Sequence, residues 1–427
     1  MKVNSTVLST IIASSIPRLS LPIFLSLLWV NPSLAKLGSA EIVGDPIVNN
    51  NKVTLRIKVK EHNGRPALDL QDENFRLIVD GQPVKFKPQD WKSSRETTPP
   101  PVWIVFLLDY SGSMNTKDSK GTSKLTGAID AIRSFIFATA KRNGDTRVVV
   151  VPFGEGQGVA ANCNRPVTND EIDRFFPAGD FKIESQLKRL AAGKPCASTN
   201  IYDPITETVK FFTNPEDGRF TVPEGEIKPR TSIILLSDGY QNKVGEPASF
   251  KRLISFLKKQ ESVIIHTLGY GLTPEELGRK YRLNRTAKRS DIGIGKPVKE
   301  EEFVDKEKLS QIAQVTSGVA EFSPDAQAVS EKLDIFLDAI LGEYEISYLE
   351  PNPERGSKHQ IKVIVTSDKD PKIESKPKDY NIGVFGRSLP RNHRLLMVFG
   401  IGTILSLGGF LPFWFWGKQL KREVLER

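Results

Sequence analysis

The feature that most constrains the fold of this chain is a run of eight residues, Val102–Asp109 (VWIVFLLD), which is apolar up to its last position. A strand that is buried on both faces of a parallel sheet has this continuous pattern, whereas a strand with one solvated face alternates apolar and polar residues. Comparable runs occur at Arg147–Phe153, Thr231–Ser237 and Ser262–Leu268. We therefore expect a sheet that is covered by helices on both faces.

Segments with the apolar spacing of amphipathic helices lie between these runs. Strands that alternate with helices predict an α/β fold with a doubly wound, mostly parallel sheet, in which ligands bind at the carboxyl ends of the strands. We place this domain at residues 102–342. The expected helices are Leu125–Ala140, Ile201–Phe212, Phe250–Gln260, Asp305–Thr316 and Ala326–Leu341, with a short strand at Val319–Phe322.

The residues before this domain have the period-two pattern of half-buried strands. Val53–Lys60 and Phe75–Val79 predict two such strands. The dipeptides Asn63-Gly64 and Asp80-Gly81 predict hairpin turns. We expect a small β-sandwich-like domain over residues 41–92.

Two further segments complete this β region. Ser93–Pro101 predicts a linker, because it is polar and its prolines can continue neither a helix nor a central strand. After the α/β domain, Tyr344–Leu349 and Gln360–Thr366 alternate again. We expect strands within residues 343–386 to pack with the N-terminal β domain.

The N-terminus, residues 1–35, has the features of a secretory signal peptide. Lys2 and Arg18 precede an apolar run, and the small residues Ser33 and Ala35 suit a cleavage site. The run is short for a membrane span. An uncleaved anchor is the alternative.

The C-terminus has 22 residues without a charge, Leu395–Trp416, which as a helix would cover about 33 Å and predict a transmembrane span. Positive charge lies on both sides, so charge alone does not settle the orientation. A cleaved signal would place the body outside the cytoplasm and the tail, residues 417–427, inside. We therefore expect a single-pass protein of the cell membrane.

The net charge of +9 is concentrated at the two ends of the chain. Residues 1–35 contribute +2 and residues 387–427 contribute +5, which leaves +2 for the body. A nearly balanced body gives no reason to expect nucleic acid as a partner.

Cys163 and Cys196 are the two cysteines of the chain, and both lie in the predicted extracytoplasmic body. An even number in an oxidising compartment favours a disulfide, which would close a loop of about 34 residues and stabilise the fold by about 3–4 kcal/mol. Two unpaired, buried thiols are the alternative.

Polar oxygen-bearing residues follow the ends of two predicted strands. Asp109, Ser111 and Ser113 form the motif D-x-S-x-S, Asp238 follows the strand Thr231–Ser237, and Thr199 precedes a helix. In a parallel sheet these ends meet at one edge. Hard cations such as Mg²⁺ prefer oxygen ligands, and a set with only two carboxylates leaves the metal able to accept an acidic group from a partner.

With these residues the chain resembles the von Willebrand factor A (integrin I-like) family from Val102 to about Leu341, and its flanks resemble bacterial A-related secreted or membrane proteins. The stretch Thr199–Asp203 is similar to the family's T-x-L-Y-D motif, with Ile201 in place of leucine. The resemblance implies a metal-ion-dependent adhesion site that binds Mg²⁺ or Mn²⁺. Two long segments, Gly154–Ser198 and Leu272–Glu302, depart from a minimal A domain, and we expect the second to be an exposed loop with one helical turn.

An enzyme is not expected. The histidines have no spacing suited to a metal or to acid–base catalysis, and His266 lies in an apolar strand where we expect it to be hydrogen-bonded within the core. Ser111 lacks the G-x-S-x-G context of a nucleophile. The glycine-rich stretches at Gly154–Gly158 and Gly293–Lys296 lack the spacing of a phosphate loop.

Two functions follow from these observations. The first is a membrane-anchored adhesion protein that binds an Asp or Glu of a protein partner through the metal. The second is a structural or assembly scaffold in which the metal mainly stabilises the fold. An accessory role beside an ATPase is disfavoured by the expected location outside the cytoplasm.

Overall fold

The computed structural model describes residues 37–142, 144–156, 162–221, 229–239, 241, 246–260, 262–293, 295–299, 302–354, 356–367, 370–383 and 391–425. The signal peptide predicted at residues 1–35 lies outside these described residues.

The region after residue 101 folds around a sheet that has six strands within the described residues. Their order is β12-β11-β10-β7-β8-β9, and all neighbours pair in parallel except the short edge strand β9. The strand order therefore reverses between β7 and β10, which is where doubly wound sheets bind ligands. The strands are β7 (Val102–Asp109), β8 (Thr146–Phe153), β9 (Phe176–Pro177), β10 (Arg230–Ser237), β11 (Val263–Tyr270) and β12 (Ala320–Ser323).

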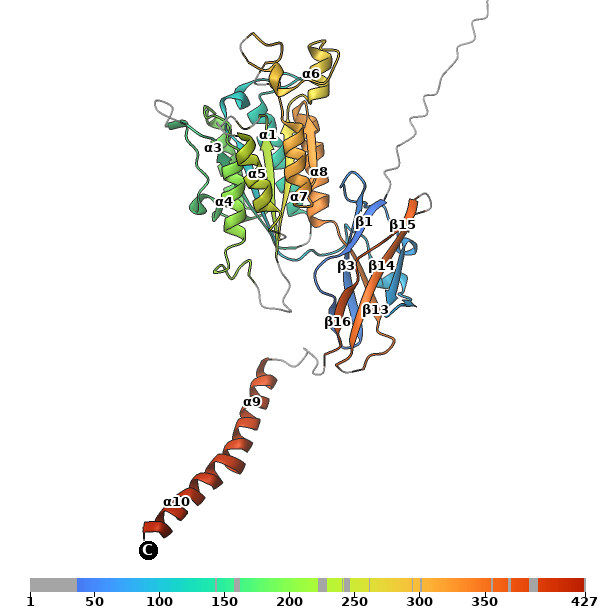
Figure 1. The fold of residues 1–427 in the computed structure, drawn as a ribbon, viewed down its shortest axis with the longest axis vertical. Helices are drawn as coiled ribbons and strands as arrows, with labels where there is room; N and C mark the ends of the chain where they lie inside the picture. The colour runs from blue at the N-terminus through green and yellow to red at the C-terminus, as the bar shows by residue number, and fades with distance from the viewer. Residues whose placement is uncertain are drawn as a thin grey trace, which may run out of the picture. The chain divides into compact units, whose positions relative to one another are not determined.

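Helices cover both faces of this sheet (Figure 1). In β7, Ile104 and Phe106 pack on one face with α1, α3 and α8, whereas Val105 and Leu107 pack on the other with α4, α5 and α7. This two-sided burial explains why the strand has no polar alternation. The helices are α1 (Lys124–Ala140), α3 (Phe181–Ala192), α4 (Tyr202–Phe212), α5 (Glu246–Leu257), α7 (Lys306–Val315) and α8 (Ala326–Leu341).

The flanking residues form two antiparallel sheets around a shared apolar core. Each sheet combines strands from before and after the α/β region, since β13 pairs with β3 and β14 pairs with β4. One sheet holds β1 (Leu37–Ile42), β2 (Ile47–Asn49), β3 (Lys52–Glu61), β6 (Trp91–Lys92) and β13 (Tyr344–Leu349). The other holds β4 (Phe75–Val79), β5 (Gln82–Val84), β14 (Lys358–Ser367), β15 (Asp370–Glu374) and β16 (Lys378–Asn381).

The first of the two predicted hairpins forms but is short. Asn63-Gly64 makes the turn, an antiparallel bridge joins Lys60 to Pro66, and backbone hydrogen bonds join Glu61 to Arg65 and Ala67 to Val59. The pairing goes no further because β13 occupies the rest of this edge of β3, up to Ile57, and the chain then crosses to the other sheet. The second hairpin is confirmed, because Asp80 and Gly81 have positive φ angles of 49° and 80° and join β4 to β5.

The segment Leu272–Glu302 is not the simple exposed loop that its composition predicts. It contains α6 (Pro274–Lys280), and a 3-10 turn at Arg289–Asp291. Leu277, Ala287, Val298 and Phe303 form a small apolar core of their own beneath its charged surface. The burial of these apolar residues therefore orders the segment. Their spacing in the sequence follows neither a helical nor a strand period, so the sequence did not predict that order.

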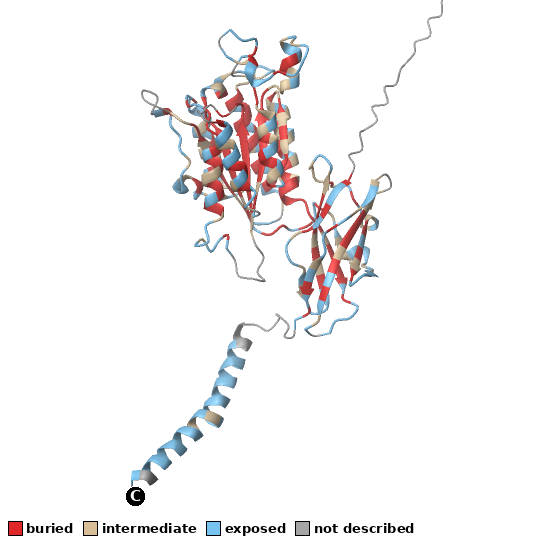
Figure 2. Ribbon diagram, viewed as in Figure 1, coloured by how far each residue is buried: buried red, intermediate tan, exposed pale blue. Residues whose placement is uncertain are grey.

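The C-terminal helix is long enough and apolar enough to cross a membrane over Leu395–Arg422, a span of 28 residues. It consists of α9 (Arg391–Leu405), a π-helical turn at Ser406–Phe410, and α10 (Leu411–Leu425). The described residues bury none of this span, whose side chains are exposed (Figure 2).

Candidate metal centre

The predicted site residues meet at the carboxyl edge of the sheet, between β7 and β10. Asp109 is the last residue of β7, and Asp238 directly follows the adjacent strand β10. The loop before α4 is tied to the D-x-S-x-S turn, because the Gly112 N–H donates to the Ala197 carbonyl over 2.9 Å. Three segments that are distant in the sequence therefore converge at the switch point of the sheet.

Hydrogen bonds link the carboxylates and hydroxyls of this site. Ser113 Oγ donates to Asp238 Oδ1 over 2.7 Å and lies 3.0 Å from Ser111 Oγ. Asp109 accepts from the Ser111 N–H at 2.9 Å and from Ser237 Oγ at 2.5 Å. Ser237 was not among the predicted site residues, although its place just before Asp238 could have suggested it.

Thr199 lies beside the residue that follows Asp238. A Cβ atom built on Gly239 would be 3.1 Å from Thr199 Oγ1, and the threonine is buried. A side chain at Gly239 would press on that hydroxyl, so glycine leaves room for it. The structure thus brings all five predicted side chains to one place.

The two carboxyl groups are fully buried and close enough to repel each other. Burial, and next the negative charge of Asp238, raise the pKa of the Asp109 carboxyl from 3.8 to about 7. A pair of buried carboxylates is costly unless a cation neutralises it. The five predicted ligands offer only oxygen atoms, two of them as carboxylates, which is the chemistry that a hard divalent cation requires.

Lys124 is a residue of the site that the sequence reasoning missed. Its ammonium group lies 2.7 Å from Asp238 Oδ2, and both side chains are buried. Lys124 is the first residue of α1, where its positive charge is repelled by the positive end of the helix dipole. The ion pair with Asp238 offsets that repulsion. A signal was present in the sequence, because Lys124 shares the apolar face of α1 with Ala128, Ala131 and Phe135.

A second tier of polar contacts supports the loop of Thr199. Gln241 Oε1 accepts from the Ile201 N–H at 2.6 Å, and Gln241 Nε2 donates to Asn200 Oδ1 at 3.1 Å. Arg289 of the Leu272–Glu302 segment donates to the Gln241 carbonyl over 2.7 Å. The loops after β10 and before α4 are therefore fixed to each other and to that segment.

Cys163 and Cys196 form a disulfide, with a Cα–Cα distance of 5.3 Å. Cys196 lies three residues before Thr199. The bond therefore closes the long segment that delivers the threonine to the site.

Rival sites are weaker. Among the described residues, no three His, Cys, Asp or Glu side chains form a group that could hold a metal. The candidate centre differs from such a group because three of its five side chains are hydroxyls.

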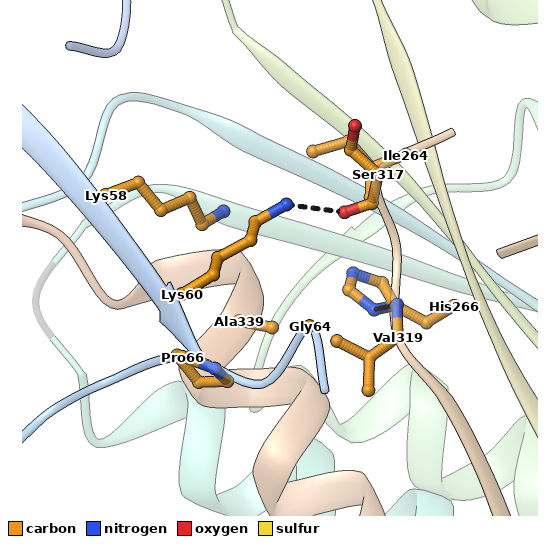
Figure 3. Close-up of a pocket in the computed structure, with 9 residues that line it drawn as sticks. All are labelled: Lys58, Lys60, Gly64, Pro66, Ile264, His266, Ser317, Val319 and Ala339. Carbon is orange, nitrogen blue, oxygen red and sulfur yellow. Dashed lines mark hydrogen bonds between the residues drawn. The ribbon is translucent and has the colours of Figure 1, made fainter. Parts of the chain in front are cut away.

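His266 lines a small pocket with Lys58 and Lys60 of β3 (Figure 3). The sequence predicts a core histidine whose ring nitrogens are both hydrogen-bonded, and the structure shows a partner for one of the two nitrogens. The Val319 N–H donates to His266 Nδ1 at 3.2 Å, whereas buried Nε2 has no partner among the described residues. Burial, followed by the positive charges of Lys58 and Lys60, lowers the pKa of His266 from 6.5 to about 3.

Comparisons with known proteins do not identify a family. No family model matches the sequence, and no curated protein sequence matches it. Among solved structures, an aerotolerance-related membrane protein from Bacteroides fragilis is 17% identical, with 56% of this chain and 99% of that chain covered and a TM-score of 0.33.

Two further solved structures are similar to this chain. The pilus adhesin SpaC from Lactobacillus rhamnosus GG is 10% identical, with 81% of this chain and 49% of that chain covered and a TM-score of 0.39. The N-terminal domain of TFIIH p34 is 10% identical, with 56% and 97% covered and a TM-score of 0.28. All of these scores are too low to carry an argument about fold or function.

Proposed function

We propose that this protein is a membrane-anchored binding protein of the von Willebrand factor A type, which holds Mg²⁺ or Mn²⁺ at its carboxyl-edge site and binds an acidic group of a partner protein through that cation. The observation that carries the proposal is the convergence of two buried carboxylates and three hydroxyls at the point where the strand order reverses. The body would lie outside the cytoplasm, with the C-terminal helix in the membrane.

The residues of the site fit such a cation. Asp109, Ser111, Ser113, Thr199 and Asp238 would hold it directly or through water, and it would supply a Lewis acid for a partner's carboxylate. The two carboxylates would balance the charge of a divalent cation, and the ammonium of Lys124 beside Asp238 would leave the site with one net positive charge. That charge favours an acidic ligand over a neutral one.

A melting experiment on the purified full chain tests cation binding. We expect Mg²⁺ or Mn²⁺ to raise Tm of the wild type over a chelator control, since a ligand that binds only the folded state stabilises it. Asp109→Asn keeps the shape of the side chain and removes its charge, so it should abolish the rise. An equal rise in both proteins would refute cation binding at this site.

A second experiment tests the adhesion role. The full chain is used to recover partners from native membranes, with Mg²⁺ and with a chelator. Recovery that depends on Mg²⁺ in the wild type and is lost in Asp109→Asn supports the cation bridge. Equal recovery with and without Mg²⁺ would exclude it.

The scaffold role is the second candidate, and the Lys124–Asp238 ion pair favours it. This buried pair joins α1 to the end of β10, so the site already links distant elements through its own side chains. On this hypothesis Asp109→Ala lowers Tm but leaves partner recovery unchanged. Loss of recovery with an unchanged Tm would count against the scaffold.

A further inference from the structure

The segment after α6 concentrates positive charge. From Arg279 to Lys299 the chain has eight basic residues and a single acid, Asp291, whereas the body as a whole nets only +2. Arg285 donates two hydrogen bonds of 2.6 Å to the carboxylate of Asp291. We call the described part of this segment, residues 279–293 and 295–299, the basic lobe.

The basic lobe is folded, so its charges have fixed positions. Leu277, Ala287 and Val298 are buried together in its own apolar core. At its root, Thr273 and Glu276 cap α6 reciprocally. Cations on an ordered framework lose less entropy when they bind a ligand than cations on a flexible loop.

The lobe is attached to the candidate metal centre through one residue. Arg289 donates to the Gln241 carbonyl, three residues after Asp238, and it also forms an ion pair with Glu246 at 3.4 Å. Gln241 in turn holds the loop that carries Thr199. Figure 1 shows α6, in yellow, beyond the ends of α1 and α8.

Several cations of the lobe form no ion pair within the part of the chain that the structure describes. Arg279, Arg282, Lys296 and Lys299 are exposed, and no ion pair joins any of them to another described residue. Two described acids that flank the lobe already have partners, since Glu302 pairs with Lys280 and Glu275 pairs with Lys306. Within the described residues, the lobe therefore offers positive charge that no carboxylate neutralises.

We propose that the basic lobe and the metal centre together bind one acidic polypeptide segment, a run of several Asp and Glu residues. This inference rests on the proposed function. One carboxylate of the segment would reach the cation, and its neighbours would face the exposed cations of the lobe. A polypeptide is favoured over a nucleic acid because the body outside the lobe is not basic.

Fluorescence anisotropy with a defined probe tests the inference. The probe is a fluorescein-labelled peptide of eight alternating Asp and Glu residues, added to the full chain in non-ionic detergent with Mg²⁺. The test variant is Arg279→Gln/Lys296→Gln/Lys299→Gln. The matched control, Lys251→Gln/Lys258→Gln/Lys259→Gln, removes three exposed charges from α5 and the residues that follow it.

We expect Kd of the test variant to rise about tenfold or more at low salt, since each lost charge pair weakens binding by a factor of a few. The control variant should bind the peptide as the wild type does. Equal affinity of the test and control variants would overturn the inference, even where Mg²⁺ still strengthens binding.

Two further measurements distinguish failure of the proposed metal bridge from failure of the inference about the lobe. If a chelator leaves the affinity unchanged while the test variant still binds weakly, the metal bridge of the proposed function fails and the lobe stands as the binding surface. If a labelled single-stranded DNA of eight phosphates binds as tightly as the peptide in Mg²⁺, the lobe is a general polyanion site and the preference for an acidic polypeptide is overturned.

Discussion

At the scale of single residues, the contact between Lys124 and Asp238 gives the candidate metal centre an internal cation. A buried ammonium beside one carboxylate compensates part of the charge that Asp109 and Asp238 bring into the core. A divalent cation that enters the same site meets this positive charge at close range. If the site binds a metal as proposed, we therefore expect Lys124 to lower the affinity for that metal while it stabilises the metal-free protein.

Lys124→Met should make the protein more dependent on its cation. Methionine keeps most of the apolar length but removes the charge, so the metal-free form loses about 3 kcal/mol or more, as expected when one partner of a buried ion pair is removed. The cation then binds without that repulsion. We expect a lower Tm in chelator and a larger Mg²⁺-induced rise than in the wild type.

Lys120→Met is the matched control, because Lys120 lies four residues earlier with an exposed side chain. It should leave the Mg²⁺ effect unchanged. A Mg²⁺-induced rise in Lys124→Met that is no larger than that of the wild type would contradict the proposed competition.

His266 should make the protein sensitive to acid. The pKa of His266 is about 3 in the folded protein and 6.5 as a free side chain. Below pH 6.5 the unfolded chain therefore binds a proton at this histidine, whereas the folded protein does not. The stability present above pH 6.5 is therefore lost as the pH falls from 6.5 towards 3, by about 3 kcal/mol at pH 4.

His266→Phe tests this sign, since an aromatic ring can keep the contact with Phe336. Denaturation curves at pH 7.5 and pH 4.5 should show a smaller loss of unfolding free energy in the variant than in the wild type. The carboxylates titrate in both proteins, so their contribution to the loss of unfolding free energy cancels when the variant is compared with the wild type. A larger loss in the variant would show that the histidine is not the source.

At the scale of elements, the segment between β8 and α4 shows how a long insertion positions one side chain. It contains α3, whose Ile183 and Leu187 are buried against the sheet, and the disulfide closes it just before Thr199. The helix was not predicted, although these two residues have helical spacing and Asp180 caps its start. A short amphipathic pattern inside a polar segment is a weak signal, because its burial depends on the neighbouring strand.

Removal of the disulfide should loosen this segment. Cys163→Ser/Cys196→Ser is expected to lower the unfolding free energy by about 3 kcal/mol, and to weaken cation binding because Thr199 is held less firmly. Urea denaturation measures the unfolding free energy, and the rise of Tm with increasing Mg²⁺ concentration measures cation binding. Reductant should produce the same change in the wild type and none in the variant; a reductant effect in the variant would point to another cause.

At the scale of the whole molecule, the β region is built from both sides of the α/β region in the sequence. Tyr344 on β13 packs with Phe75 and Trp91 from the N-terminal part, and its hydroxyl donates to the Ala67 carbonyl. The N-terminal strands therefore depend on residues that follow the α/β region by sequence. A fragment that ended before residue 343 would lack eight of the twenty described residues that are buried in this core.

The C-terminal helix should be the element that retains the protein in a membrane. Deletion of residues 391–427 removes an apolar span that would cover about 40 Å as a helix. We expect the full chain to remain in the membrane fraction after a carbonate wash, and the truncated chain to be released. Retention of the truncated chain would show that residues 1–35 are an uncleaved anchor.

The sequence by itself determined the five parallel strands of the α/β sheet, the C-terminal apolar span and the five oxygen-bearing residues of the candidate centre. These features are local: a strand such as Val102–Asp109 shows its two-sided burial in its own composition, and Asp109 and Asp238 are marked by their places at strand ends.

Only the tertiary structure decided which distant residues meet. It pairs most of β3 with the distant strand β13, places Lys124 against Asp238, and orders the basic lobe beside Gln241. The physical reason is that these contacts depend on competition between partners far apart in the chain. A local pattern shows that a residue will be buried, but it does not show which residue will bury it.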